Sequence, residues 1–257
     1  MKQGNELPRV LAIHAHPDDV EFQCSGTLAL LHKLGCPISV VTMTAGDCGS
    51  AEYGPLEISR IRREEGRKGA ETLGADYTCL EFLDLQIVVD NDSRRRVTEV
   101  IRRLRPDLVL TAPPVDYMSD HEMTSRLVRD ACFNASTPNY QTQQQNPAAP
   151  MEKIPHLYYV DAVGGIDLYG NPLKPQFVVD VTSVYDIKRK SLACHESQRN
   201  WLLRQHGMDE YLESCDRWSA VRGEYIGVAH GEGFRQHLGH PYPESDLLQR
   251  LVGGKTL

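Results

Sequence analysis

Short apolar runs alternate with longer amphipathic stretches along this chain, and this alternation limits the fold more than any other feature of the sequence. Strand-like runs are predicted at residues 10–13, 38–43, 77–82, 107–111, 156–160 and 177–181. Helix-like stretches are predicted at residues 26–34, 57–73, 94–104, 120–133, 184–198 and 209–222. Strands that alternate with helices form a parallel sheet through right-handed crossovers, with helices on both faces. The sequence therefore predicts an α/β, Rossmann-like fold with a mostly parallel sheet.

Length and composition favour one globular domain. The 257 residues are within the size that a single core reaches, so we expect one domain over residues 1–257. Residues 139–155 are rich in Gln, Asn, Pro and Ala, and predict a long surface loop that is mobile or forms a lid. The seven cysteines form no CxxC pair, which indicates reduced, mostly buried thiols.

Charge and hydropathy exclude several classes of partner. The formal net charge of -7 argues against nucleic acid, because proteins that bind it carry a basic surface. No run approaches the roughly 18 apolar residues of a membrane span, and the polar residues 1–9 lack the apolar core of a secretory signal. We therefore expect a cytoplasmic protein without a membrane span. The basic runs at residues 60–68 and 94–96 are interpreted as solvated helix faces with i,i+4 pairs.

The segment HAHPDDVE, residues 14–21, follows the first predicted strand directly. Its density of acids and histidines is hard to attribute to packing, although a single histidine at a strand end is usually a structural residue. His16 and Asp19 lie in a loop that can bring both side chains to one point, with Asp18 directed elsewhere. Catalytic zinc sites take three ligands from imidazole and carboxylate groups and leave one position to water. The segment supplies two such ligands.

A second polar segment, DYMSDH at residues 116–121, follows the strand predicted at residues 107–111. In open parallel sheets, ligands bind beyond the carboxyl ends of the strands, so we expect both polar segments at the same edge. His121 is the candidate third ligand. Asp120 is equally well explained as the N-cap of the helix that follows.

These segments resemble the LmbE-like, or PIG-L, family of N-deacetylases. The resemblance rests on AHPDDVEF at residues 15–22, GTLA at 26–29, TAGDCGS at 44–50, Arg62 with Glu65 and Ala70 ahead of Leu73-Gly74, Asp84, the 116–121 segment and HESQ at 195–198. The first motif is highly specific, and the likeness extends over roughly residues 9–235. Family members remove acetyl groups from N-acetylglucosamine-type conjugates. The resemblance implies an LmbE-like catalytic core with this activity.

The resemblance also implies a role for each matching position. His16, Asp19 and His121 would bind Zn2+, or another divalent transition metal, and Asp18 would be the general base. The chemistry agrees, because a metal lowers the pKa of bound water to about 7, and a carboxylate beside it can pass the proton to the leaving amine. The implied substrate is a small amino-sugar conjugate, and the resemblance favours a homo-oligomer.

One position departs from the family pattern. Where the family has a histidine that helps to stabilise the oxyanion, this chain has Met118, and Ser119 replaces the family's proline. A thioether is no strong hydrogen-bond donor, and loss of one oxyanion donor costs about 100- to 1,000-fold in rate in a comparable site. His195, His230 and Tyr117 are candidates to replace it, although a structural or surface role explains each of them as well.

Arg62 and two aspartates complete the candidate site. Arg62 matches a family position that contacts substrate, whereas an arginine on a charged helix is more often solvated. Asp47 could bind a sugar hydroxyl or shape an Asx-turn. Either Asp47 or Asp116 could instead fix the tautomer of a metal-binding histidine, as carboxylates near metal sites commonly do.

Three functions remain open from the sequence. The favoured one is hydrolysis of the N-acetyl group of an amino-sugar conjugate. The second is zinc-dependent hydrolysis of another amide or ester at the same site. The third, suggested by Met118, is a metal-binding protein with weak or lost turnover. Dinucleotide binding is rejected, because the first turn lacks GxGxxG and places acids where a pyrophosphate needs backbone amides.

Overall fold

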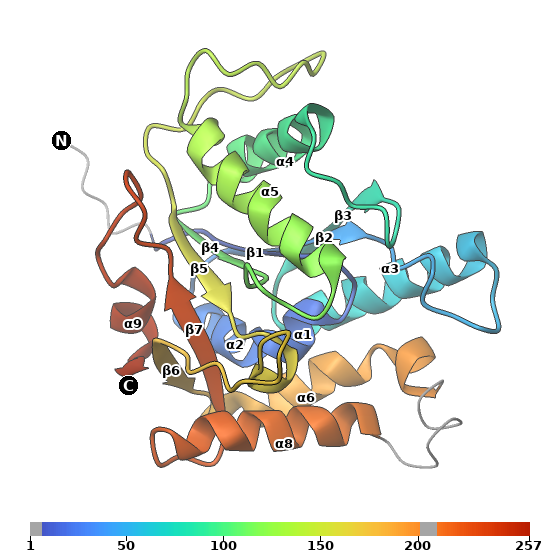
Figure 1. The fold of residues 1–257 in the computed structure, drawn as a ribbon, viewed down its shortest axis with the longest axis vertical. Coiled ribbons are helices and arrows are strands. Elements are labelled where there is room, and N and C mark those ends of the chain that lie inside the picture. Colours follow the sequence, from blue (N-terminus) through green and yellow to red (C-terminus); the bar gives the residue numbers. More distant parts are fainter. Residues whose placement is uncertain (1–6, 201–209) are drawn as a thin grey trace.

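A computed structural model describes residues 7–200 and 210–257, and within them an eight-stranded sheet forms the centre (Figure 1). The strands lie in the order β3-β2-β1-β4-β5-β7-β6-β8. Their bounds are β1 Val10–His14, β2 Ile38–Thr44, β3 Asp76–Phe82, β4 Leu108–Thr111, β5 His156–Val160, β6 Phe177–Asp180, β7 Gly231–Gln236 and β8 Lys255–Thr256. Strands β1 to β5 pair in parallel, and β7 is antiparallel to both β5 and β6. The predicted α/β fold with a mostly parallel sheet is confirmed.

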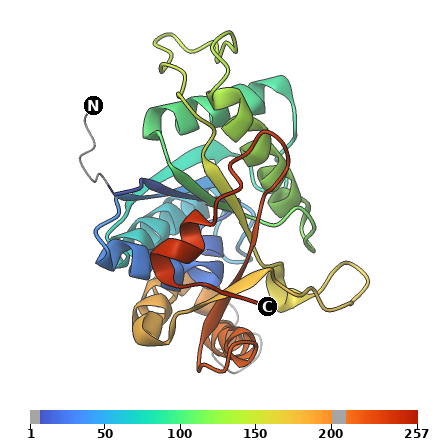
Figure 2. The same ribbon diagram turned by 90° about the vertical axis from the view of Figure 1, so that its left-hand side faces the viewer.

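Helices cover both faces of the sheet (Figures 1 and 2). Their bounds are α1 Asp19–Gln23, α2 Ser25–Lys33, α3 Pro55–Thr72, α4 Asn91–Leu104, α5 Ser119–Ala135, α6 Tyr185–Ala193, α8 Glu210–Glu224 and α9 Leu247–Val252, with short 3-10 helices at Val163–Gly165 and Thr182–Val184. Successive residues of a strand point to opposite faces. Accordingly, Val10 and Ala12 of β1 belong to the core that includes residues of α2 and α9, whereas Leu11 and Ile13 pack with residues of α4 and α5. Burial on both faces explains why β1 is a continuous apolar run.

The C-terminal part of the sheet differs from the prediction. Strand β7, with the sequence GEGFRQ, was not predicted, because it carries neither an apolar run nor a regular alternation. The helix predicted at residues 184–198 is interrupted, since α6 ends at Ala193 and His195 is not helical. The short helix α1 was also missed. Residue 209, the predicted start of the last helix, lies outside the described residues, as do residues 1–6.

Residues 139–155 contain no helix or strand and lie beyond the C-terminal end of α5 (Figure 1). Three hydrogen bonds hold the segment to α4. Thr142 Oγ1 and the Ala148 backbone N–H donate to the Glu99 carboxylate, at 2.7 and 2.9 Å, and Arg103 Nη2 donates to the Asn146 carbonyl oxygen at 2.8 Å. The predicted lid is therefore not what the structure shows, because the segment packs on α4 at the end of α5 away from Ser119. Among the described helices, none has both the length and the apolar character of a membrane span.

Candidate metal centre and active site

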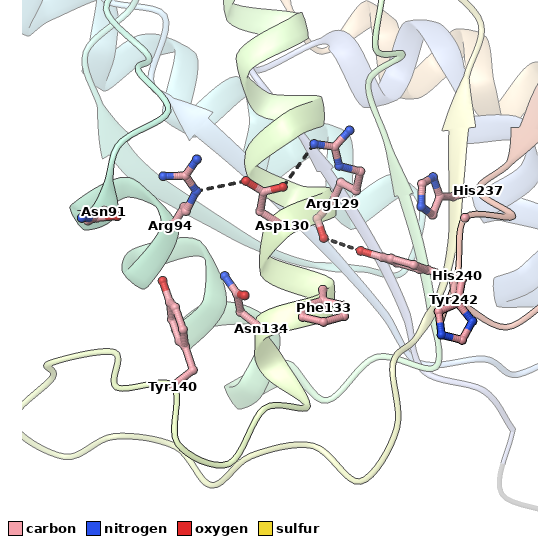
Figure 3. A pocket seen from close by; sticks show the side chains of 11 residues that line it. Asn91, Arg94, Arg129, Asp130, Phe133, Asn134, Tyr140, His237, His240 and Tyr242 are labelled. Atoms are coloured by element: carbon pink, nitrogen blue, oxygen red, sulfur yellow. Dashed lines mark hydrogen bonds and ion pairs between the residues drawn. The ribbon is translucent and has the colours of Figure 1, made fainter.

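A cavity of about 630 Å3 lies between α4, α5 and residues 237–242 (Figure 3). Arg94 and Arg129 both contact the Asp130 carboxylate there, at 3.0 and 3.2 Å, so its principal charges are already paired. None of the predicted site residues lines this cavity. The residues predicted from the sequence meet elsewhere, at the carboxyl edge of the parallel strands.

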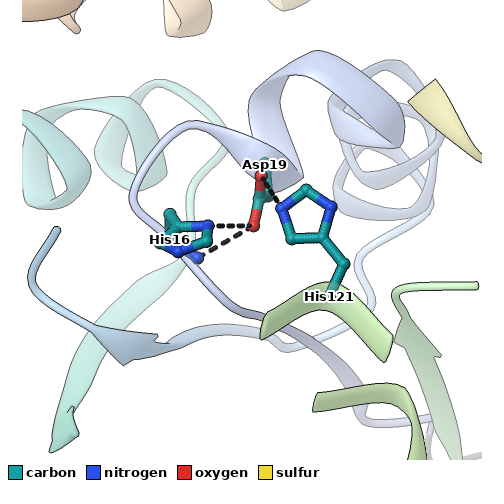
Figure 4. Close-up of side chains that lie close together, drawn as sticks. All are labelled: His16, Asp19 and His121. Carbon is teal, nitrogen blue, oxygen red and sulfur yellow. Dashed lines mark hydrogen bonds and ion pairs between the residues drawn. The ribbon is translucent and has the colours of Figure 1, made fainter. Parts of the chain in front are cut away.

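His16, Asp19 and His121 converge where the chain leaves β1 and enters α5 (Figure 4). Strands β1 and β4 are neighbours, with Ile13 opposite Thr111, so the segments that follow them share one edge. Potential ligand atoms of the three side chains lie within 4.8 Å of one another. The Asp19 carboxylate lies between the two rings, 3.4 Å from His16 Nδ1 and 3.3 Å from His121 Nε2. The structure therefore brings together the three residues that the sequence suggested as ligands.

A carboxylate contacts the outer nitrogen of each imidazole. His121 Nδ1 lies 3.0 Å from Asp116 Oδ1, and His16 Nε2 lies 2.9 Å from Asp84 Oδ1. Such contacts fix the orientation and tautomer of a histidine, leaving the other nitrogen free for a metal. Asp116 thus has the bracing position that the sequence left open for it. Asp84 matched the family motif, but the sequence gave no indication that it contacts His16.

Asp120 is part of the site and not a helix cap. Met118 occupies the N-cap position of α5 and makes no capping hydrogen bond through its side chain. The Asp120 carboxylate accepts a hydrogen bond from the Leu85 backbone N–H at 2.7 Å and lies 3.5 Å from His16 Nε2. His16, Asp84 and Asp120 form a second group with metal-ligand spacing, and the carboxylates of Asp84 and Asp120, like that of Asp19, each accept a backbone hydrogen bond.

Electrostatics at this edge favour positive charge. Burial lowers the pKa of His16, yet hydrogen bonds with Asp120 and the neighbouring aspartates raise it overall well above its usual value. Burial also lowers the pKa of His121, but Asp19 and Asp116 raise it overall to about 10. Imidazole nitrogen and carboxylate oxygen are the ligands that Zn2+ and similar divalent metals take. The donors and their surroundings therefore fit a divalent cation.

Asp18 is held beside this group through one carboxylate oxygen. Its Oδ2 accepts hydrogen bonds from the Tyr211 hydroxyl at 2.7 Å and from Arg62 Nη2 at 3.1 Å. No hydrogen bond from the described residues reaches Oδ1. The backbone φ of Asp18 is 108°, a left-handed value that residues other than glycine rarely adopt. Burial raises the pKa of the Asp18 carboxyl, and Arg62 opposes this effect.

Arg62 projects from α3 into the site and is not part of the solvated face predicted for residues 60–68. The side chain is buried, and it donates to the Pro17 carbonyl oxygen at 2.6 Å as well as to Asp18. A Cβ at Gly46 or Gly49 would lie within 2.4 Å of Arg62 Nη1, so the loop after β2 needs glycine at both positions. Other members of the run, such as Arg67, do pair with acids on the exposed face.

The other site residues suggested by the sequence differ in how far they are buried. Asp47 Oδ1 accepts a hydrogen bond from the Asp84 backbone N–H at 2.9 Å. Asp47 therefore stabilises the loop that carries Asp84, whose carboxylate contacts His16. Tyr117 is 68% exposed, and its ring packs edge-on against His121. His195 is fully buried, with Nε2 3.5 Å from Glu21 Oε1. Burial lowers the pKa of His195, but the Glu21 carboxylate raises it by more, so the pKa is above its usual value.

His230 lies away from the cluster. Its ring stacks on Tyr185 of α6 at a centroid distance of 3.6 Å. Of the three residues considered as replacements for the family's auxiliary histidine, only Tyr117 lines a cavity at the site; His195 and His230 do not. Tyr211 was missed, because it is 193 positions from Asp18 in the sequence and no local pattern connects them.

Two adjoining cavities meet at the proposed metal ligands and share Asp18, Asp19 and Tyr117. One has a volume of about 270 Å3 and is mainly polar; its lining includes Arg62, Cys48, Asp84 and Gln198. The other has a volume of about 190 Å3, and its lining includes Phe22, Gln23, Val163 and Tyr211. The site therefore offers one polar and one more apolar space on either side of the same carboxylates.

Comparison with known proteins identifies the family. Residues 11–132 match the family model of PIG-L, the GlcNAc-PI de-N-acetylases. Diacetylchitobiose deacetylase of Thermococcus kodakarensis is 30% identical over 200 residues, which cover 76% of this chain and 71% of that protein. The chain belongs to the PIG-L family. The resemblance stated from the sequence motifs is thus confirmed.

Other PIG-L relatives extend the comparison. The structure of N,N'-diacetylchitobiose deacetylase from Pyrococcus horikoshii matches with a TM-score of 0.77 at 26% identity, covering 93% of this chain and 88% of that one. The 4-oxalmesaconate hydratase of Pseudomonas putida is 28% identical over 198 residues, which cover 74% of both proteins. Similar PIG-L proteins therefore carry names for two reactions, removal of an acetyl group and hydration.

Proposed function

We propose that this chain is a metal-dependent N-deacetylase, which hydrolyses the N-acetyl group of an N-acetylglucosamine-type conjugate to acetate and a free amine. The observation that carries the proposal is the convergence of His16, Asp19 and His121, with the Asp18 carboxylate beside them. The deacetylase names of several PIG-L relatives support it. We treat residues 1–257 as one catalytic domain, because strands from both ends of the described chain join the same sheet.

The proposed ligands are His16, Asp19 and His121, and the proposed metal is Zn2+. A divalent metal held by these residues would lower the pKa of a water molecule and polarise the acyl carbonyl group. Asp116 and Asp84 keep the two imidazoles oriented, each through the nitrogen that does not face Asp19. Asp47 supports the loop that carries Asp84.

The proposed general base is Asp18. Tyr211 and Arg62 engage Oδ2, so Oδ1 is the oxygen available to accept a proton from the attacking water. The water oxygen then bonds to the acyl carbon, the carbon–nitrogen bond breaks, and the proton passes from Asp18 to the departing nitrogen. The products are acetate and the amine of the sugar.

We assign the sugar to the polar cavity and the acyl group to the apolar one. Arg62 and Gln198 line the polar cavity and can bind hydroxyl groups. Support for a substrate contact by Arg62 comes from its place in the lining of this cavity and from its hydrogen bond to Asp18. Phe22 and Val163 line the other cavity and suit a methyl group. We further propose that the enzyme is a cytoplasmic homo-oligomer.

Acetate release and metal content together test the proposal. Purified protein is expected to bind one metal ion and to release acetate from N-acetylglucosaminyl glycosides faster than it hydrolyses simple esters. His121→Ala is expected to lose both the metal and the activity. An unchanged metal content in that variant would contradict the ligand assignment, and preference for esters would favour a different zinc hydrolase. Bound metal without turnover would favour a metal-binding protein.

Hydration is the second candidate function. A relative with 28% identity and similar coverage is named a hydratase, and hydration also delivers water to an electrophilic carbon next to a base. Loss of the ultraviolet absorbance of 4-oxalmesaconate, measured beside acetate release, distinguishes the two. Absorbance loss without acetate release would replace deacetylation by hydration.

A further inference from the structure

The cavity lined by Phe22 and Val163 is larger than the acetyl group that the proposed function places in it. Its volume is about 190 Å3, and a water-sized group occupies about 30 Å3. The cavity thus has space for about six such groups, whereas the methyl of an acetyl group fills about one. We infer that the protein also removes N-acyl groups longer than acetyl, up to about six carbons in length. This inference rests on the proposed function.

Apolar side chains form much of the lining of this cavity. Phe22, Val163 and Tyr211 line it and are each partly exposed, so their surfaces are accessible from the cavity. The ring of Tyr117, which is 68% exposed, lines it as well. Pockets lined by aromatic and branched aliphatic side chains bind apolar groups. An acyl chain of several methylene groups therefore has more apolar surface to contact here than one methyl group uses.

The cavity also adjoins the residues that would carry out the hydrolysis. It shares Asp18, Asp19 and Tyr117 with the polar cavity, so an amide bond placed at these carboxylates reaches both spaces. Sugar hydroxyl groups need hydrogen-bond partners, which Arg62 and Gln198 offer in the polar cavity. An acyl chain needs none. The acyl chain therefore extends from the reacting carbon into the apolar cavity.

Val163 is held in place by the carboxylate that also contacts a proposed metal ligand. The Val163 backbone N–H donates to Asp116 Oδ2 at 3.4 Å, while Asp116 Oδ1 lies 3.0 Å from His121 Nδ1. The short 3-10 helix that starts at Val163 is closed by a hydrogen bond from the Gly165 N–H to the Ala162 carbonyl oxygen at 2.9 Å. The lining residue is thus fixed relative to the reacting centre before an acyl chain enters.

A longer chain leaves the reaction unchanged. The water oxygen bonds to the acyl carbon, the carbon–nitrogen bond breaks, and Asp18 passes the proton to the departing nitrogen, as for acetyl. The products are a short fatty acid and the amine of the sugar. Burial of each further methylene group strengthens binding up to about fourfold, so the natural chain should prefer acyl groups longer than acetyl.

A series of methyl glycosides of N-acylglucosamine tests this preference, with acetyl, butyryl, hexanoyl and decanoyl groups on the same sugar. Release of the free amine measures all four substrates in the same way. We expect kcat/KM to rise from acetyl to hexanoyl and to rise no further for decanoyl, because that chain exceeds the space available. A lower kcat/KM for hexanoyl than for acetyl would overturn the inference.

Val163→Phe identifies the cavity that holds the chain, because the larger side chain takes up part of its volume. We expect kcat/KM for hexanoyl to fall at least about tenfold more than kcat/KM for acetyl. Val163→Ala should act in the opposite direction and extend the gain to decanoyl. An equal loss for all acyl groups in Val163→Phe would overturn the inference, because the cavity would then hold the sugar. Val163→Ile makes a smaller change of the same kind if Val163→Phe does not fold.

Val115→Phe is the matched control. Val115 is 43% exposed, lies between β4 and α5, and lines neither cavity. The same exchange there should leave kcat/KM unchanged for all four substrates, and a shift in preference equal to that of Val163→Phe would overturn the inference. If the natural chain releases acetate but cleaves no longer acyl group, only this inference fails. If it cleaves none of the four substrates, the proposed function fails and this inference fails with it.

Discussion

The metal ligands and the general base of the proposed site are supported by different parts of the molecule. His16 and His121 are braced by aspartates from neighbouring loops, all within the parallel part of the sheet. Asp18 adjoins the ligand Asp19 in sequence, yet helices α3 and α8 hold its carboxylate, through Arg62 and Tyr211. Because different residues support the ligands and the base, metal affinity and turnover should respond to different mutations.

Asp18→Asn should give the largest separation of the two properties. Asparagine also tolerates the left-handed backbone at this position, but it cannot accept the proton. We expect kcat to fall by about 100- to 10,000-fold, while metal content measured by atomic emission stays at the natural level. Loss of metal in this variant would contradict the separation, because Asp18 would then contribute to the metal ligands.

Asp116→Asn should affect the metal instead. It weakens the contact that orients His121 without changing a proposed ligand. We expect the metal dissociation constant to rise about 10- to 100-fold, as for other residues that brace metal ligands. Competition with a chelating dye measures this constant, and kcat at saturating metal should fall by a smaller factor. An unchanged dissociation constant would argue against a bracing role for Asp116.

Tyr211→Phe should reduce turnover moderately and leave metal affinity intact. The variant keeps the ring, which packs with Phe22, and removes the hydroxyl that reaches Asp18. A hydrogen bond to a charged group is worth about 1.5–3 kcal/mol, so a loss of about tenfold in kcat is expected. Tyr185→Phe is the matched control, because that hydroxyl also donates to an aspartate at 2.7 Å, Asp216, away from the site. Equal losses in both variants would refute a specific role for Tyr211.

His14→Leu should have the smallest effect on activity and a measurable effect on stability. This histidine of β1 is fully buried, neither ring nitrogen has a hydrogen-bond partner among the described residues, and burial lowers its pKa from 6.5 to about 4. The unfolded chain therefore takes up the proton first, and the folded state loses stability as the pH falls from 6.5 toward 4.

Urea unfolding of metal-free protein at pH 7 and pH 5 measures this contribution. Between these two values, the natural chain should lose about 2 kcal/mol more unfolding free energy than His14→Leu. Equal losses would mean that His14 finds a partner in solution. The two histidines differ in the direction of their pKa shifts. Burial lowers the pKa of His14, whereas the neighbouring aspartates raise the pKa of His16, two residues along the chain.

Local patterns were sufficient to predict the parallel part of the sheet and the cluster of His16, Asp19 and His121. Each of these features follows from a short segment, either an apolar run or polar residues directly after one. Long-range features were missed. Strand β7 has two glycines and few apolar residues, and it is stabilised by its pairing with β5 and β6. The Tyr211 contact with Asp18 depends on how α8 packs, which no local pattern encodes.

Arg62 shows where local reasoning gives the wrong environment. Charge patterning on α3 predicts a solvated side chain, and most of its charged neighbours do lie on the surface. Arg62 is buried instead, because the loop after β2 has Gly46 and Gly49 where any side chain would collide with the guanidinium group. The glycines that make room for it lie well before Arg62 in the sequence, and only the fold brings them together.

The distant origin of Tyr211 has a consequence for how the protein is made. During translation, all three proposed metal-binding side chains leave the ribosome before α8 has been synthesised. A nascent or prematurely terminated chain can thus carry every donor for a cation while its catalytic carboxylate still lacks the hydroxyl group that holds it. Full hydrolytic competence would then arise late in biosynthesis, after the capacity to capture metal.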